Sequence, residues 1–190
     1  IRSGRVYRLM KSMDLPKMST AKPKFRYHKP TVSLDYPNIL NQQFDPNDPN
    51  RAWVSDITYI PVKNKFVYLC VILDLFSRKV IAWKLSHRMT ASLVIDTLDT
   101  ALTHRQPIES VLFHSDRGSQ YTSVAFRQFL DAHNLIASYS KPGYPYDNAV
   151  IESFFKYLKK DELNRRNFHS LEEVSLATFS YIEGWYNNKR

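Results

Sequence analysis

Cysteine and long apolar runs are scarce in this sequence, and each shortage excludes a class of protein. Cys70 is the one cysteine among 190 residues, which excludes a disulfide framework and a cysteine-based zinc site and indicates a reducing compartment. No apolar run approaches the roughly 20 residues that a membrane span needs, so we expect no membrane association. No basic segment followed by an apolar one opens the chain, so we expect no secretion.

The residues that are present form an ordinary globular composition. Hydrophobic residues make up 43% of the chain, charged residues 24% and aromatic residues 14%, whereas only 4 residues are glycine. A chain of this length forms one domain, or one domain with an appendage, and buries enough apolar surface to fold without cross-links. Both ends of the sequence stand in mid-pattern, so we expect a fragment of a longer protein.

The net charge of +9 is concentrated near the N-terminus. Residues 1–30 hold nine Lys and Arg side chains against Asp14, a charge of +8, and the remaining 160 residues amount to +1. A basic arm on a near-neutral body suggests a polyanionic partner, most often nucleic acid, although a solvated terminus gives the same pattern. The candidate DNA contacts in this arm are Arg5, Arg8, Lys11, Lys22, Lys24 and Arg26.

The first 50 residues divide into a helix and a linker. Apolar side chains recur at helical spacing over residues 2–13. From Pro16 to Pro49, prolines punctuate a polar stretch that cannot sustain a helix or a central strand. We therefore expect an extended linker up to residue 50 and a compact domain that begins near Arg51.

The remaining sequence predicts a mixed α/β fold. Strands are expected over residues 53–62, 66–75, 79–85, 110–114 and 135–139, and the turns among the first three suit an antiparallel meander. Helices are expected over residues 90–104, 124–133, 148–166 and 171–186. This order predicts a mixed five-stranded sheet flanked by helices, and the ribonuclease-H-like arrangement is one candidate among several such folds.

Three acids stand at positions where chemistry is possible, yet each has an ordinary explanation by itself. Asp56 lies inside the first expected strand, where Asp is rare and costly to bury, unless it faces solvent on an edge. Asp116 follows a strand end, the usual place of a ligand crevice, but Asp-x-Gly also forms common turns. Glu152 opens a helix, where an acid often only complements the helix dipole.

The helix around Glu152 carries more information. At about 100° per residue, Glu152, Lys156 and Lys159 share a face that is separate from the apolar stripe. A carboxylate followed by two ammonium groups suits a substrate that brings phosphates and chemistry that needs a bound metal. A Glu–Lys pair on a solvated helix face would look the same.

Spacing and local motifs together resemble a known family. Asp56 and Asp116 have 59 residues between them, and Asp116 and Glu152 have 35, which is similar to the D-D-(35)-E signature of retroviral-type integrases and transposases. The surrounding motifs resemble the IS3 family of bacterial insertion-sequence transposases, in register from about Arg51 to Arg190. These motifs are WVSDITY (53–59), LDLFSR (73–78), HSDRGSQY (114–121), YDNAVIESFF (146–155) and WYN (185–187). Residues 1–26 resemble the tail of the helix-turn-helix region that precedes this domain, and residues 27–50 the linker.

The resemblance implies a DNA transposase that cleaves strands at insertion-sequence ends and transfers the resulting 3′-OH. It implies two Mg²⁺ ions, replaceable by Mn²⁺, with Asp56 bridging both, Asp116 holding one and Glu152 the other. The implied partners are double-stranded element ends, target DNA and further copies of the chain on that DNA. The implied location is the bacterial cytoplasm, at the nucleoid.

The resemblance also implies supporting residues. Lys159 matches a position that contacts the terminal DNA, Lys156 would assist as a phosphate contact, and Asn148 would order the loop that enters the helix. Residues 143–146 resemble a mobile active-site loop. The family pattern leaves the role of Glu162 open.

Five further residues, some of them inside these motifs, are expected to be structural. We expect His114 to act as a structural partner, Cys70 to be inert core, and Trp53, Trp83 and Trp185 to be buried.

Two other functions stay open at this point. The first is a ribonuclease-H-like nuclease without strand transfer, although such enzymes usually carry four acids. The second is a non-catalytic, DNA-binding remnant of an insertion sequence, against which the presence of all three acids and Lys159 argues.

Overall fold

The computed structural model describes residues 3–13 and 36–189, in two compact units, Ile1–Leu34 and Asp35–Arg190. In the first unit the described part is the helix α1 (Ser3–Ser12) and the residue that follows it. Three of the candidate DNA contacts, Arg5, Arg8 and Lys11, lie exposed on α1. The other three, Lys22, Lys24 and Arg26, lie outside the described residues, so the expected helix-turn-helix tail stays a prediction.

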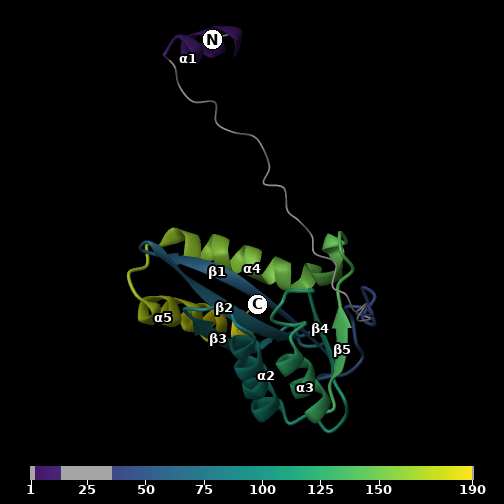
Figure 1. The fold of residues 1–190 in the computed structure, drawn as a ribbon. Coiled ribbons are helices and arrows are strands. Elements are labelled where there is room, and N and C mark those ends of the chain that lie inside the picture. Colours follow the sequence, from purple (N-terminus) through teal and green to yellow (C-terminus); the bar gives the residue numbers. More distant parts are fainter. Residues whose placement is uncertain (1–2, 14–35, 190) are drawn as a thin grey trace. The chain divides into compact units, whose positions relative to one another are not determined.

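The second unit is built around one mixed five-stranded sheet (Figure 1). Its strands are β1 (Ala52–Val62), β2 (Lys65–Asp74), β3 (Val80–Ser86), β4 (Leu112–Ser115) and β5 (Ile136–Tyr139). The strand order is β3-β2-β1-β4-β5, in which β1–β2 and β2–β3 are antiparallel and β1–β4 and β4–β5 are parallel. The expected sheet and its initial meander are confirmed.

Helices cover both faces of this sheet (Figure 1). The longer ones are α2 (Ala91–Arg105), α3 (Val124–Ala132), α4 (Ala149–Asp161) and α5 (Leu171–Tyr181). Short helical segments follow or precede them: η1 (Pro145–Asn148), η2 (Leu163–Arg165), η3 (Ile182–Tyr186) and α6 (Asn187–Lys189). None of the helices among the described residues combines the length and the apolar character that a bilayer crossing requires.

The two C-terminal helices are shorter than expected. The helix expected to reach residue 166 ends at Asp161, because Glu162 leaves helical dihedral angles (φ −128°, ψ −62°) before the η2 turn. The helix expected to reach residue 186 widens into the π turn η3, which contains Gly184, a poor helix former. Trp185 lies in this turn and is 40% exposed, so the expectation that it is buried is wrong.

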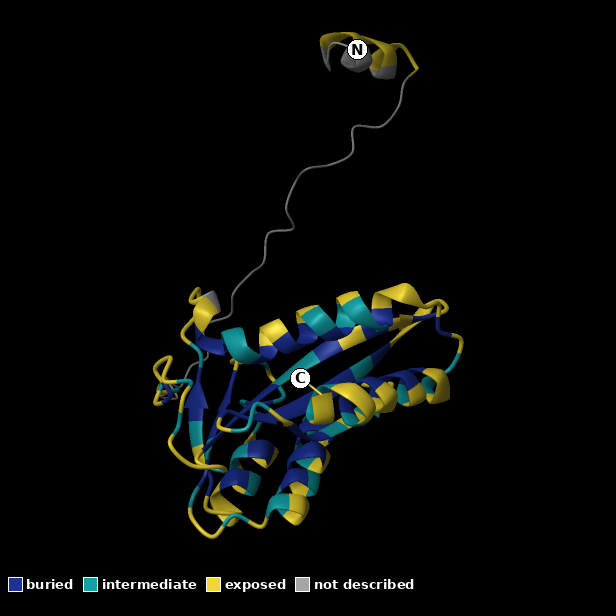
Figure 2. Ribbon diagram, turned by 180° about the vertical axis from the view of Figure 1, so that it is seen from behind, coloured by how far each residue is buried: buried dark blue, intermediate teal, exposed yellow. Residues whose placement is uncertain are grey.

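The alternation of side chains along β1 divides the core into two layers. Val54 and Ile60 face α4 and α5, whereas Trp53 packs on the other face with α2 and α3. Figure 2 shows the same division, with buried residues between each helix and the sheet and exposed residues on the outer helix faces. Cys70 is fully buried in the second layer, and burial raises the pKa of its thiol to about 11, so it is inert core as expected.

The proline-rich segment before β1 belongs to the compact unit. Residues 36–50 form no helix or strand, as expected, but Leu40 is 2% exposed and Phe44 packs against the same core. The unit therefore begins at Asp35 and not near Arg51. Proline content indicates correctly that regular structure is absent, but it says nothing about packing.

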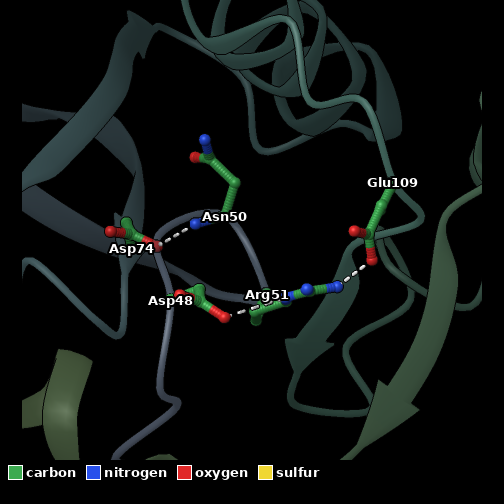
Figure 3. Close-up of polar contacts among 5 residues, drawn as sticks. All are labelled: Asp48, Asn50, Arg51, Asp74 and Glu109. Carbon is green, nitrogen blue, oxygen red and sulfur yellow. Dashed lines mark hydrogen bonds and ion pairs between the residues drawn. The ribbon is translucent and has the colours of Figure 1, made fainter.

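Asp74 fixes the turn after β2 and also the entry to β1, where Figure 3 shows its contact with Asn50. Its buried carboxylate accepts hydrogen bonds from the Asn50 backbone N–H (3.1 Å) and from the backbone N–H (3.0 Å) and hydroxyl (2.6 Å) of Ser77. Next to Asn50, Arg51 forms ion pairs with Asp48 and Glu109. The acid of the LDLFSR motif is therefore structural.

Candidate active site

Asp56 and Asp116 come together where two parallel strands separate. β4 pairs with β1 only at Ala52, Trp53 and Val54, so Asp56 lies just past the last pair. β4 itself ends at Ser115, and Asp116 is the next residue. The carboxyl ends of adjacent parallel strands are the usual place of a ligand crevice in α/β sheets, and here each strand contributes one carboxylate to it.

Glu152 reaches the same place from the first turn of α4. A pocket of about 290 Å³ is lined by all three acids, Asp56, Asp116 and Glu152, together with Ser140, Lys141, Gly143, Tyr144 and Asn148. Asp116 and Glu152 are exposed, and Asp56 is half-buried. Residues that are 96 positions apart in the sequence therefore share one open cavity.

The pKa of Asp56 reflects its burial and the charges around it. Burial raises the pKa of its carboxyl to about 7, and the negative charges of Asp116 and Glu152 add to the increase. A hydrogen bond from the Ile57 backbone N–H and the positive charge of Lys159 oppose it. A carboxyl whose pKa is raised by burial and by neighbouring carboxylates is a candidate functional group. Positive charge added next to it would stabilise its ionised form and lower that pKa.

Each aspartate has one oxygen engaged by the backbone. Asp56 Oδ1 accepts a hydrogen bond from the Ile57 N–H (2.7 Å), and Asp116 Oδ1 accepts one from the Gly118 N–H (2.9 Å). A Cβ at Gly118 would lie 3.0 Å from Asp116 Oδ1, so glycine suits this close approach. The described residues thus leave Oδ2 of both aspartates available for a ligand.

Asn148, which lines the pocket, has a buried side-chain oxygen without a donor in the described part of the chain. It is 6% exposed, and its Oδ1 is buried and accepts no hydrogen bond from the described residues. A buried carbonyl oxygen without a donor costs free energy on the order of 1–3 kcal/mol.

The two lysines of α4 differ in their surroundings. Lys159 is half-buried, with Nζ 4.8 Å from the ring centroid of Tyr59. Burial lowers the pKa of its ammonium, while the nearby Asp56 raises it. Neither lysine lines the pocket, and Lys156 is exposed. Of the two, only Lys159 is half-buried and interacts electrostatically with Asp56.

His114 has a structural role, as expected. Ser138 Oγ accepts hydrogen bonds from the backbone N–H groups of Ile39 and Leu40 (both 3.0 Å), which leaves its own proton for His114 Nδ1 at 2.8 Å. The His114 Nε2–H then donates to Ser140 Oγ (3.1 Å). Burial lowers the pKa of this imidazole to about 4, in agreement with a neutral ring.

The described residues hold no closed metal cage. Within 3–13 and 36–189, no three His, Cys, Asp or Glu side chains lie close enough together to hold one ion. Glu162 is also engaged elsewhere, in an ion pair with Arg166 (2.6 Å). The three carboxylates therefore line one pocket without forming a compact three-ligand cluster among the described residues.

Comparison with known proteins identifies the family. Residues 46–145 match the family described as "Integrase core domain", and residues 133–190 match a second family of the same description. The transposase for insertion sequence element IS904 of Lactococcus lactis is 40% identical over 186 residues, which cover 98% of this chain and 74% of that protein. This chain belongs to the IS3 family of insertion-sequence transposases. It carries the integrase-type catalytic core of a DNA transposase.

A second relative shows how much of such a transposase is present. Transposase InsF for insertion sequence IS3A of Escherichia coli is 44% identical over 153 residues, which cover 80% of this chain and 53% of InsF. The chain thus spans about three quarters of one relative and about half of the other.

Solved structures agree on the fold of this transposase core. The catalytic domain of Mos1 mariner transposase has a TM-score of 0.55 and 23% identity, covering 73% of this chain and 72% of that one. The HTLV-2 integrase catalytic core domain in complex with magnesium has a TM-score of 0.54 and 20% identity, covering 70% and 86%. The ribonuclease-H-like fold is confirmed.

Some lining residues of the transposase pocket were not expected from the sequence. Gly143 and Tyr144 belong to the predicted active-site loop, but Ser140 and Lys141 were not among the candidates. Both directly follow β5, which is the next parallel strand beside β4. The rule that ligands bind at the carboxyl ends of parallel strands, applied to this third strand, is the signal that points to them.

Proposed function

We propose that this transposase core cleaves DNA at the ends of an insertion sequence and joins the freed 3′-OH to target DNA at a two-metal site. The observation that supports the proposal is the convergence of Asp56, Asp116 and Glu152 on one open pocket. The chemistry is an in-line displacement in which first water and then the 3′-OH attacks phosphorus. No covalent protein intermediate is required, and accordingly no Ser or Tyr nucleophile is assigned.

The donor set fits Mg²⁺. Carboxylate oxygens are its preferred protein ligands, and it usually keeps several positions for water and phosphate. In this proposal Asp56 would hold both ions, Asp116 one and Glu152 the other. When bound, two such ions activate the attacking oxygen and stabilise the leaving oxygen.

The cationic side chains of the site would hold the DNA. Lys159, about two turns after Glu152, is placed for a phosphate next to the reacting one. Lys156 lies exposed on the same helix and adds a peripheral phosphate contact. Lys141 and Tyr144, which line the pocket, are placed to orient the strand end.

We also propose the setting in which this core works. The partners are double-stranded element ends, target DNA and further copies of the chain assembled on that DNA. The location is the bacterial cytoplasm, at the nucleoid, since the substrate is chromosomal DNA.

The direct test is an incubation of the chain with end-labelled insertion-sequence DNA and either Mg²⁺ or Mn²⁺. We expect strand cleavage and joining to occur with either ion and to stop when EDTA removes it. Cleavage and joining are scored separately on a sequencing gel. Cleavage without any joining would make the chain a nuclease, and unchanged activity in EDTA would contradict the two-metal site.

A second prediction concerns the basic arm. Residues 1–30 carry a charge of +8, and phosphate neutralisation with counterion release makes such an arm a source of sequence-independent affinity. Deletion of residues 1–30 should weaken DNA binding and flatten the slope of log affinity against log salt, with little change in the melting temperature. The deletion leaves the compact unit intact because that unit begins at Asp35. An unchanged slope would show that the arm does not contact DNA.

A further inference from the structure

Asp147 is a buried acid that the proposed chemistry does not use. It is 2% exposed, whereas its neighbours Tyr144 and Tyr146 are 58% and 72% exposed. It precedes Asn148 and lies five residues before Glu152, but it is not among the residues that line the carboxylate pocket. A buried carboxylate needs strong hydrogen bonds, so its partners indicate what it does.

Three donors from two segments meet on this carboxylate. Asp147 Oδ2 accepts hydrogen bonds from Asn38 Nδ2 and from the Lys141 backbone N–H, both at 2.8 Å. Oδ1 accepts one from Gln42 Nε2 at 2.9 Å. Asp147 therefore joins both ends of residues 140–147, which we call the active-site loop, and attaches this loop to residues 36–44, which we call the strap.

The strap is itself fixed to the sheet. The Tyr139 N–H donates to the Pro37 carbonyl (2.9 Å), and Ser138 Oγ accepts from the N–H groups of Ile39 and Leu40 (both 3.0 Å). The Leu40 side chain is buried in the main core. The amides of Asn38 and Gln42 are thus presented to Asp147 from an anchored segment.

The strap also reaches the neighbour of a second pocket carboxylate. Arg117, directly after Asp116, donates from Nη2 to the Tyr36 carbonyl and from Nε to the Ser140 carbonyl, both at 3.0 Å. Its guanidinium lies 5.7 Å from the Tyr36 ring centroid. The residue after Asp116 and the loop before Glu152 are therefore held by the same short segment.

We propose that Asp147 is a positioning residue that clamps the active-site loop to the strap. Through this clamp it sets Ser140, Lys141 and Tyr144 around the three carboxylates, without contacting DNA or metal. The loop depends on the clamp because Gly143 is in a left-handed conformation (φ +81°) and Tyr144 and Tyr146 are largely exposed, so apolar packing does little to hold it. The activity readouts below rest on the proposed strand transfer, but the exchange readout does not.

The test substitution is Asp147→Asn, which keeps the size of the side chain and removes one acceptor oxygen and the charge. We expect kcat for end cleavage to fall on the order of 10²-fold, the scale of a misplacement of about 1 Å, while KM for DNA changes little. Amide hydrogen exchange at Lys141 should accelerate on the order of tenfold or more, because its acceptor is weakened. Circular dichroism should stay native.

A reciprocal exchange provides the rescue. In the double variant Asn38→Asp with Asp147→Asn, the hydrogen bond between positions 38 and 147 re-forms with donor and acceptor reversed. Asp147 Oδ2 also accepts from the Lys141 N–H, so the amide nitrogen now at that position leaves this N–H without its acceptor. We therefore expect the double variant to recover part of kcat while exchange at Lys141 stays fast. Asn38→Asp alone places two carboxylates against each other and should be at least as defective as Asp147→Asn. The matched control is Asp45→Asn, an exposed acid just beyond the strap that pairs with Arg78.

Three results would overturn the proposal. They are unchanged kcat and unchanged exchange in Asp147→Asn, a fall in kcat without faster exchange, and a double variant no better than the worse single one. A parent chain that neither cleaves nor joins DNA would instead refute the proposed function, and exchange at Lys141 would still decide whether Asp147 holds the loop.

Discussion

Replacing Asp56 by Asn is expected to abolish strand cleavage and joining and, at the same time, to stabilise the metal-free protein. The substitution removes the carboxylate that is proposed to hold both ions, so activity should fall on the order of 10³-fold or more. It also removes a half-buried charge that burial, Asp116 and Glu152 all disfavour. Activity is read on labelled DNA, and stability is read from thermal unfolding in EDTA.

The gain in stability should depend on pH in a defined direction. The folded protein raises the pKa of Asp56 from 3.8 to about 7, so it holds this proton more tightly than the unfolded chain does. The contribution of this tighter proton binding to the free energy of unfolding is fully present below about pH 4 and is lost as the pH rises through about 7. At one pKa unit per about 1.4 kcal/mol, the charge costs on the order of 2–4 kcal/mol at pH 8.

The melting temperature of Asp56→Asn should therefore be several degrees higher than that of the parent at pH 8, since each kcal/mol raises it by roughly 2–4 °C. At pH 4 the two melting temperatures should be nearly equal. Asp96→Asn, an exposed acid on α2, is the control and should change neither property. Parent-like strand transfer in Asp56→Asn would refute the site. A melting temperature of Asp56→Asn below that of the parent at pH 8 would show that the ionised Asp56 carboxylate stabilises the fold and is not disfavoured by Asp116 and Glu152.

Lys159→Glu is expected to separate DNA engagement from metal binding. Its Nζ lies against Tyr59 and near Asp56 but is not a metal ligand. Loss of one well-placed phosphate contact costs on the order of 1–3 kcal/mol, about 5- to 150-fold in affinity, and the new carboxylate adds repulsion. Binding and joining of element-end DNA should fail, while Mn²⁺ binding measured by relaxation should persist.

The control for this variant is available on the same helix. Lys160→Glu makes the same charge change at an exposed neighbouring position. It should therefore lose only the part of the DNA affinity that comes from long-range electrostatic attraction. If Lys159→Glu joins ends as well as the parent does, the lysine face of α4 is solvated and does not hold the element-end DNA. Equal losses of DNA binding and joining in both variants would indicate that the effect comes from the change in net charge and not from a specific contact of Lys159.

The sequence predicts the fold and the three acids because both depend on patterns that are local or fixed in spacing. The meander follows from three expected strands over residues 53–85 that are joined by short turns, and the three acids follow from motifs in register with a family. Helix ends were predicted less well, since no glycine or proline marks the end of α4 at Asp161. The exposed Trp185 also shows that residue type alone does not decide burial.

The strap was not predicted, because its contacts join residues about 100 positions apart. The hydrogen bonds of Asn38 and Gln42 with Asp147 span 109 and 105 positions, and no spacing rule covers such pairs. In the sequence this segment reads as a polar linker between prolines. Its role depends on side-chain amides whose partners become visible only once β5 and the active-site loop are folded.

The two-layer core has a consequence for how the three acids stay in register. Asp56 and Asp116 belong to the sheet and its rim, whereas Glu152 is mounted on α4, whose buried residues pack in only one of the layers: Ile151, Phe154, Phe155 and Leu158. The thickness of that single layer therefore acts as a spacer between the third carboxylate and the other two. Substitutions in the core layer beneath α2 and α3 need only preserve the fold. Substitutions in the layer beneath α4 must also preserve the distance between Glu152 and the two aspartates.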